Sequence, residues 1–318
     1  MKRIFLFIGF VFSLPTVSYS FPMKIAVTVD DLPGWHLVKS GNAQKTASLF
    51  ASVFKQHKVP ATGFVIGALA SRTKDSMNAL TVWSNAGLVL ANHTWDHVPY
   101  DKSSTKEFWS GVARTEKLLA PFYKRYGWNR IFRFPMLNQG DIPEKETAAN
   151  EYFFSTKTLL AHVSVDTSDW AFARYYDQFT ETGDLTAIKN LEALYFKHIM
   201  DCVKYAEEAS AAIFSKQIPQ ILLIHANQLN AVMLPDILKE LRLQKYDFIS
   251  LESVLDSPEY RPFRYKIIYQ PADHFFYHMS HELKRDLPQG LDRSSYRYFK
   301  SYWEPQIKKL CMTALLSE

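Results

Sequence analysis

The sequence predicts an α/β fold built on a parallel sheet, either open or closed into a barrel. Short apolar segments alternate with helix-patterned segments from residue 24 to about residue 255, which favours parallel strands joined by helices. Polar residues lie at the ends of five predicted strands, and in parallel sheets this edge is where active sites form. They are Asp30, Asp31, His93, Arg133, Asp166, Asp169 and His225. The 318 residues are 47% hydrophobic and 22% charged, a globular composition.

Short runs of β-branched and other apolar residues predict seven strands. They lie at 24–29, 61–66, 88–91, 131–134, 162–165, 221–224 and 248–250. The first strand is expected to end in a polar loop at 30–34, and the fourth is expected to stop at Pro135 because proline cannot donate to a sheet.

The clearest helix signal is Ser104-x-x-Glu107, a capping box that predicts a helix ending near Ala120. Helical spacing of apolar residues predicts further helices. They lie at 43–57, 76–86, 186–214, 235–243 and 251–255. The alternation stops after residue 256, and the remaining segment is rich in aromatic residues. We expect that segment to pack against the rest of the fold.

The first twenty residues have the pattern of an export signal. Lys2 and Arg3 precede an apolar run over 4–14, and Ser18 and Ser20 supply small residues before a cleavage site at Phe21. The run is shorter than the roughly 20 apolar residues that cross a membrane. We therefore expect export to the periplasm or the medium, without stable membrane insertion. A buried N-terminal strand is the alternative.

The net charge and the cysteine content place few further limits on the function. Removing residues 1–20 leaves 35 basic and 32 acidic residues, a net charge of +3, and no block of Lys and Arg suggests a nucleic-acid partner. Cys202 and Cys311 are the two cysteines. They can pair in an oxidising compartment or remain buried thiols, and the sequence leaves the oligomeric state open.

Asp31, His93 and His97 form a candidate metal site. The two histidines are four residues apart, and a helical turn would place their imidazoles on one side. A carboxylate from another strand end completes a two-His, one-carboxylate set, which is typical of a catalytic divalent metal. Two loop histidines that bind backbone carbonyls are the alternative for the pair alone.

Asp30 and His225 are candidate acid–base groups. Asp30 adjoins Asp31, and two adjacent carboxylates are costly to bury without a nearby cation. A solvated turn is the alternative, since Asp is common before Pro-Gly. His225 follows the apolar run 221–224, so it is either a buried structural residue or an acid–base group.

Five short motifs occur in order along the chain. They are Thr28-Val29-Asp30-Asp31, His93-Thr94-x-x-His97, Arg133-Phe134-Pro135, Asp169-Trp170 and Leu223-Ile224-His225. The set resembles the polysaccharide deacetylase family, the carbohydrate esterases of family 4. The resemblance implies a distorted (β/α) barrel of parallel strands over residues 21–256, followed by a C-terminal extension over 257–318. It also implies a hydrolase that removes N-acetyl, or alternatively O-acetyl, groups from a polysaccharide or oligosaccharide.

The resemblance assigns the chemistry to particular residues. One divalent metal ion, zinc or alternatively cobalt or nickel, would be bound by Asp31, His93 and His97. Asp30 would be the general base, paired with Arg133. His225 would protonate the leaving amine, with Asp169 orienting it and raising its pKa.

Four residues would contact the substrate: Pro135, Met136, Trp170 and Leu223. The backbone N–H of Met136 would stabilise the oxyanion. Met136 departs from the Tyr or Phe usual at this position, and Ala226-Asn227 departs from the Asp that follows the histidine in many members.

Other assignments remain open at this level. His274, His278 and His281 in the extension are expected to belong to an aromatic packing segment, and a second metal site is the alternative. The main site would also suit a non-sugar amide or cyclic imide, because the metal chemistry does not require a carbohydrate. A secreted glycan-binding protein without activity is the remaining alternative.

Overall fold

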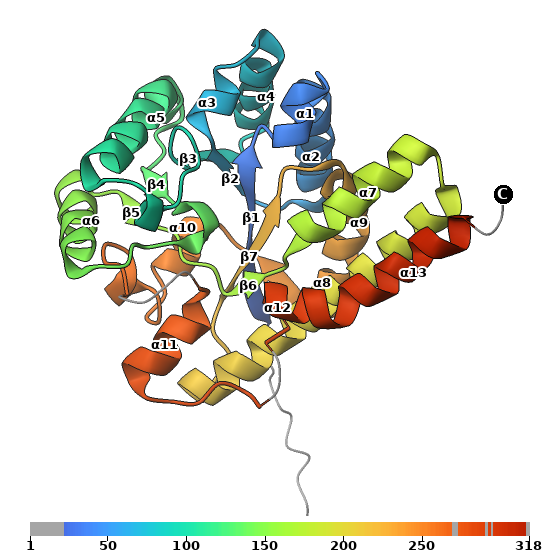
Figure 1. Ribbon diagram of the computed structural model, residues 1–318. Helices are drawn as coiled ribbons and strands as arrows, with labels where there is room; N and C mark the ends of the chain where they lie inside the picture. The colour runs from blue at the N-terminus through green and yellow to red at the C-terminus, as the bar shows by residue number, and fades with distance from the viewer. Residues whose placement is uncertain (1–21, 269–272, 290–291, 294, 316–318) are drawn as a thin grey trace, which may run out of the picture.

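Eight parallel strands form one curved sheet at the centre of the molecule (Figure 1). The structure is a computed structural model that describes residues 22–268, 273–289, 292–293 and 295–315, and the predicted signal peptide at residues 1–20 lies outside these ranges. The strands are β1 (Met23–Leu32), β2 (Thr62–Val65), β3 (Val89–Asn92), β4 (Ile131–Phe132), β5 (Leu159–Leu160), β6 (Val165–Asp166), β7 (Gln220–His225) and β8 (Tyr246–Phe248).

The strand order is β5-β4-β3-β2-β1-β7-β6, and β8 pairs with the first residues of β1. The two outermost strands, β5 and β6, follow each other in the chain. The segment between them crosses from one end of the sheet to the other: Ala161 N–H donates to Phe132 O next to β5, and Ser164 N–H donates to Ile221 O on β7. The predicted distorted (β/α) barrel of parallel strands is confirmed, as a half-barrel whose gap is bridged by this one segment.

Several strand boundaries differ from the prediction, among them the strand predicted at 248–250, which lies at 246–248. The single strand expected at 162–165 is replaced by β5 and β6, which have two residues each and flank the crossing. Strands of this length are too short to show a period-2 pattern. The polar loop expected at 30–34 is also wrong in part, because β1 continues to Leu32 and includes Asp30 and Asp31.

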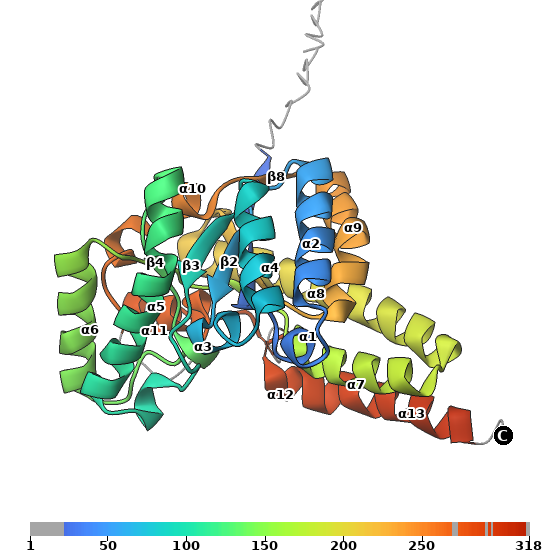
Figure 2. The ribbon, with the colours of Figure 1, turned by 90° about the horizontal axis from the view of Figure 1, so that it is seen from above.

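Helices surround the sheet, with α5 and α6 beside β3 to β5 and α8 beside β6 and β7 (Figures 1 and 2). The helices of the α/β part are α1 (Trp35–Lys39), α2 (Ala43–His57), α3 (Gly67–Ala70), α4 (Lys74–Asn85), η1 (Tyr100–Lys102), α5 (Thr105–Tyr126), η2 (Pro135–Leu137), α6 (Pro143–Thr156), α7 (Asp169–Thr182), α8 (Leu185–Phe214), α9 (Gln228–Leu243) and α10 (Leu251–Leu255). The predicted helices at 43–57 and 251–255 are confirmed as α2 and α10.

The capping box at Ser104 forms and begins α5. Helix α5 runs to Tyr126 rather than ending near Ala120, and Gly127, at φ 68°, terminates it in the left-handed conformation that glycine adopts readily. Helix α9 begins seven residues before the predicted range 235–243, because Asn227 caps its N-terminus. Helices α6 and α7 were not predicted.

The chain after residue 256 packs closely on the α/β part. Its elements are η3 (Arg261–Phe263), α11 (Phe275–Leu283), α12 (Tyr296–Tyr298), the π-helical turn η4 (Phe299–Trp303) and α13 (Glu304–Leu315). The buried Phe299 lies 5.0 Å from Phe172 of α7 between ring centroids, and Trp303 lies 5.7 Å from His198 of α8. Phe275 N–H donates to Val163 O in the crossing segment. These contacts pack η4 against α7 and α8 and join the start of α11 to the crossing segment.

No helix in the described part of the chain combines the length and apolarity needed to cross a bilayer.

Candidate active site

A cavity of about 670 Å³ opens at the carboxyl edge of the sheet, within the range usual for small-molecule sites. Eight of the predicted site residues line it: Asp30, Asp31, His93, His97, Met136, Trp170, Leu223 and His225. The other three, Arg133, Pro135 and Asp169, are buried and are not among its lining residues. Arg133 and Asp169 hydrogen-bond to residues of the lining, as described below.

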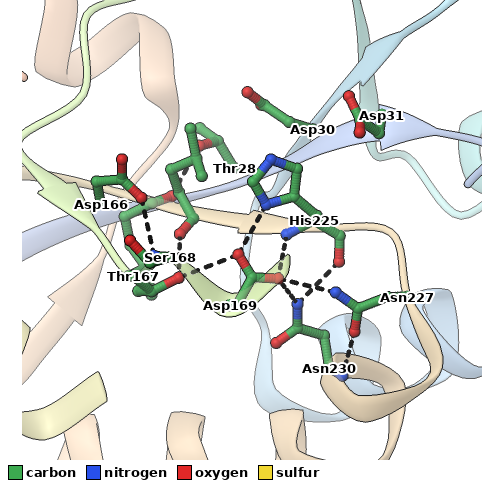
Figure 3. Close-up of polar contacts among 12 residues, drawn as sticks. Thr28, Asp30, Asp31, Asp166, Thr167, Ser168, Asp169, His225, Asn227 and Asn230 are labelled. Carbon is green, nitrogen blue, oxygen red and sulfur yellow. Dashed lines mark hydrogen bonds and ion pairs between the residues drawn. The ribbon is translucent and has the colours of Figure 1, made fainter. Parts of the chain in front are cut away.

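A bulge in β1 turns both aspartates toward this cavity. The ladder between β1 and β2 shifts register between Val29 and Leu32, and Asp31 lies inside the shift at φ 66°. In a regular strand, adjacent side chains point to opposite faces, and a bulge changes that direction. Asp30 is still paired with His225 in the neighbouring ladder. The bulge therefore brings two consecutive carboxylates into one site (Figure 3).

The two histidines converge from a loop, and the predicted helical turn over residues 93–97 is wrong. Thr94 and His97 have φ values of 67° and 60°. Asn92 Oδ1 accepts the Thr94 N–H at 2.8 Å, and Thr94 Oγ1 accepts the His97 N–H at 3.1 Å. These local bonds shape the loop, and the imidazole centroids of His93 and His97 come within 4.9 Å.

The arrangement of Asp31, His93 and His97 suits a single divalent cation. His93 Nδ1–H donates to Arg133 O at 2.8 Å, so its Nε2 presents a lone pair. Asp31 Oδ1 lies 3.6 Å from His93 Nε2 and 3.2 Å from His97 Nε2. That oxygen is buried and has no hydrogen-bond partner of suitable geometry among the described residues. A bound cation would satisfy it, and the three ligand atoms lie within 4.8 Å of one another.

The protonation states agree with a ligand set. Burial, assisted by the nearby His97, lowers the pKa of His93 to about 4, although Asp30 and Asp31 oppose this. His93 is therefore neutral at physiological pH, as a metal ligand must be. Burial alone would raise the pKa of Asp31, but the charges of His97, His225 and His93 outweigh it and hold that pKa well below its usual value.

Asp30 is held by a buried arginine. Arg133 has no solvent exposure, and its Nη1 donates to Asp30 Oδ1 at 2.6 Å and to Thr28 Oγ1 at 2.8 Å. The guanidinium lies 4.1 Å from the centroid of the Phe64 ring. Asp30 Oδ2 lies 3.6 Å from His93 Nε2. One oxygen of Asp30 is thus anchored, while the other lies beside the candidate metal site.

His225 is oriented by Asp169, which is fully buried at the start of α7 (Figure 3). His225 Nδ1–H donates to Asp169 Oδ1 at 2.7 Å, and the His225 backbone N–H donates to Oδ2 at 3.0 Å. Burial lowers the pKa of His225, but the charge and hydrogen bond of Asp169, with the charges of Asp31 and Asp30, outweigh it and raise that pKa to about 10. The side chain therefore carries a proton at neutral pH.

Three further donors to Asp169 were not found from the sequence. Thr167 Oγ1–H donates to Oδ1 at 3.2 Å, and the Nδ2 groups of Asn227 and Asn230 donate to Oδ2 at 2.8 and 2.5 Å. Asn227 also caps α9. Asparagine suits residue 227 because its amide donates to Asp169, whereas an aspartate there would face the Asp169 carboxylate. An Asn-x-x-Asn pair after a strand-end histidine is the signal that was available.

The remaining cavity wall is largely apolar. Trp170, Leu223 and Met136 line it, and Met136 has a left-handed backbone at φ 54°. Pro135 lies buried in η2 behind Met136. Tyr296, from the C-terminal segment, also lines the cavity and lies 4.7 Å from the Trp170 ring. The sequence alone did not single out Tyr296.

The three histidines of the C-terminal segment do not form a common ligand group in the described part of the chain. His274 instead lies beside Asp273 and Asp292, with its Nε2 at 2.6 Å from Asp292 Oδ2. His278 lies beside Gln139. The alternative of a second metal site made by all three histidines is therefore not supported, because His274 and His278 have different partners. Cys202 is a buried free thiol.

Comparison with known proteins agrees with the motifs. Residues 22–152 match the sequence model of the family described as polysaccharide deacetylase. A peptidoglycan-N-acetylglucosamine deacetylase from Bacillus cereus is 27% identical over 149 residues, which are 46% of each chain, so the match spans about half the length of this curated relative.

Solved structures share the fold. A CE4 family pseudoenzyme from Bacillus anthracis matches with a TM-score of 0.50 at 17% identity, over 74% of this chain and 66% of that one. A mutant of the same pseudoenzyme with restored enzymatic activity matches with a TM-score of 0.50 at 18% identity, over 74% and 68%. The matched residues and the five motifs agree with each other: residues 22–152 of this chain are similar to the polysaccharide deacetylase family.

Proposed function

We propose that this protein is a metal-dependent deacetylase that hydrolyses N-acetyl groups of a polysaccharide or oligosaccharide. The observation that carries the proposal is the convergence of three components on one cavity: the cation-binding residues, the Arg133–Asp30 pair and the Asp169–His225 pair. The relative from Bacillus cereus is named for N-acetylglucosamine in peptidoglycan, which supports an N-acetylated amino sugar as the substrate class.

Asp31, His93 and His97 would hold the metal ion, which we propose to be zinc. When bound, a divalent ion there supplies a Lewis acid that polarises the acetyl carbonyl and lowers the pKa of water. Asp30 Oδ2 lies beside this set and accepts the proton of the attacking water. Arg133 holds Oδ1 of the same carboxylate, so Asp30 stays ionised and oriented.

His225 supplies the proton for the leaving group. Its Nδ1–H is bound to Asp169, so Nε2 is the nitrogen that can donate to the departing amine as the C–N bond breaks. Trp170 and Leu223 provide an apolar wall for the acetyl methyl group. The Met136 N–H would donate to the oxyanion, as such donors do in other acyl transfers.

The match to a pseudoenzyme raises a non-catalytic alternative, a glycan-binding protein. Against it, both acid–base pairs of this chain are complete, at 2.6 Å for Arg133–Asp30 and 2.7 Å for His225–Asp169. We also propose that residues 1–20 direct export to the periplasm or medium and that residues 21–256 are the catalytic domain. Mass spectrometry of the exported protein should find a mature N-terminus at Phe21.

Acetate release from a panel of acetylated glycans tests the function. Metal-free protein should be inactive, and addition of zinc or cobalt should restore release from at least one N-acetylated glycan. The Asp30→Asn variant should release acetate far more slowly. Asp96→Asn is its matched control, because Asp96 is exposed in the loop between His93 and His97 and does not line the cavity. Release from small amides or imides alone would favour a non-sugar substrate. Glycan binding without any release would favour the non-catalytic alternative.

A further inference from the structure

A second cavity of about 230 Å³ adjoins the active-site cavity. The two cavities share four lining residues: Met136, Leu137, Asp166 and Tyr296. The second cavity is completed by Asp273, His274 and Ser295, which all belong to the C-terminal segment. The segment after residue 256 therefore builds most of a chamber that adjoins the proposed site of deacetylation.

Tyr296 stands at the junction of the two cavities and is held on several sides. Its ring lies 4.7 Å from Trp170 and 5.8 Å from Phe299, and the Tyr296 and Phe299 planes are nearly parallel at 10°. Lys300 Nζ lies 5.4 Å from the Tyr296 centroid. Phe299 is itself buried against Phe172. Tyr296 is therefore a braced part of the wall, and a ligand would meet it in a defined position.

The second cavity also has two carboxylates in its lining, in contrast to the aromatic wall at Tyr296. Asp166 Oδ1 accepts the Ser168 N–H at 3.0 Å, and Asp273 Oδ1 accepts the His274 N–H at 2.8 Å. A carboxylate offers about four acceptor positions, so each retains capacity for further donors. Aromatic faces beside hydrogen-bond acceptors are suited to a pyranose ring, which has apolar C–H faces and hydroxyl donors around its edge.

We propose that the C-terminal segment forms a binding subsite for the sugar ring next to the acetylated one, with Tyr296 as the residue that contacts that ring. The preferred substrate is then an oligomer of at least two sugar units. This inference rests on the proposed function and deepens it, because a small amide or imide in the first cavity would gain nothing from the second.

Binding to a protein that cannot turn over tests the subsite directly. Zinc-loaded Asp30→Asn protein is titrated calorimetrically with N-acetylglucosamine and with its β-1,4-linked trimer. The trimer should bind more tightly than the monomer. Adding Tyr296→Ala should weaken trimer binding by about 3- to 10-fold, the size of one aromatic contact, and leave monomer binding unchanged. Tyr296→Phe keeps the ring and should retain trimer binding, which separates lost contact from misfolding.

Tyr302→Ala is the matched control, because Tyr302 is an exposed aromatic residue of the same segment that lines neither cavity. It should leave both affinities unchanged. In the active enzyme, Tyr296→Ala should raise KM for the trimer with little change in kcat.

Three results would overturn the subsite: equal affinity for monomer and trimer, no binding of either, or an equal loss for both in Tyr296→Ala. Absence of acetate release by wild-type protein from every glycan would instead contradict the proposed function. The binding measurements would still decide the subsite in that case.

Discussion

His225 Nδ1 and Asp169 Oδ1 lie 2.7 Å apart, and Asp169 has no solvent exposure. Asp169 accepts from four side chains and one backbone N–H, so a buried negative charge is held directly behind the imidazole. This pair raises the pKa of His225, whereas burial alone would lower it. The proton on His225 thus depends on a residue that does not line the cavity.

Asp169→Asn should lower kcat by about 100-fold or more, the usual contribution of a positioned general acid. Loss of the negative charge lowers the pKa of His225, so the fraction that carries a proton falls. Activity that requires protonated His225 declines as pH rises through its pKa, and this decline should therefore begin at a lower pH in the variant. Rate–pH profiles of both proteins measure the shift. An unchanged profile would contradict the assigned role of Asp169.

Asp31→Asn should reduce metal content as well as activity. The buried Oδ1 of Asp31 faces two imidazole nitrogens, and a neutral amide is a much weaker ligand for a divalent ion. Dialysed wild-type protein should retain one zinc per chain by elemental analysis, and the variant clearly less. Chelation should also lower the Tm of the wild-type protein, because a ligand that binds only the folded state stabilises it. Full zinc content in Asp31→Asn would refute this ligand assignment.

Arg133→Met should lower the free energy of unfolding by about 3–5 kcal/mol, because it leaves Asp30 as a buried charge without its partner. Adding Asp30→Asn to Arg133→Met removes that charge and should recover part of the loss. Urea unfolding of the two single variants and the double variant measures this coupling. Lys197→Met, at an i,i+4 ion pair between the exposed Lys197 and Asp201 on α8, is the control and should cost about 1 kcal/mol or less. Simple additivity of the two buried changes would argue against a coupled pair.

Acid should destabilise the fold through buried neutral histidines. Burial, with the charge of Arg133, lowers the pKa of His162 to about 4 although its bond to Phe263 O opposes this. An unfolded histidine titrates near 6.5, so between about pH 6.5 and 4 the unfolded state binds more protons. The free energy of unfolding should therefore fall as pH is lowered through this window.

Urea unfolding at pH 7, 6, 5 and 4 measures this dependence for wild-type protein and His162→Gln. The variant should show a shallower fall over the same window. His57→Gln at the surface end of α2 is the control and should follow the wild type. A wild-type curve that is flat from pH 6.5 to 4 would contradict the assignment.

The site residues that could be predicted from the sequence are those at the carboxyl ends of strands. Asp31, His93 and His225 were recognisable because apolar runs precede them and the carboxyl ends of parallel strands meet. The short distances between these side chains depend on structural features that leave no periodic pattern in the sequence. The bulge at Asp31 and the left-handed residues Thr94 and His97 arise from local hydrogen bonds and tertiary packing, so a helical turn was the wrong model for the histidine pair.

Other elements were missed for different physical reasons. Strands β5 and β6 have two residues each, which is too short for any pattern. Helix α7 begins with Asp169 and Trp170, directly after the polar residues 166–168. Tyr296 reaches the cavity only through tertiary contacts with Trp170 and Phe299. Such contacts between distant segments leave no local signal in a single sequence.

Acetate release and zinc content measured together on Asp30→Asn protein test the central claim most directly. Asp30 is assigned as the base and is not a metal ligand. The variant should therefore keep about one zinc per chain, as the wild type does, while releasing acetate at least about 100-fold more slowly. Release at the wild-type rate with full zinc content would contradict the account.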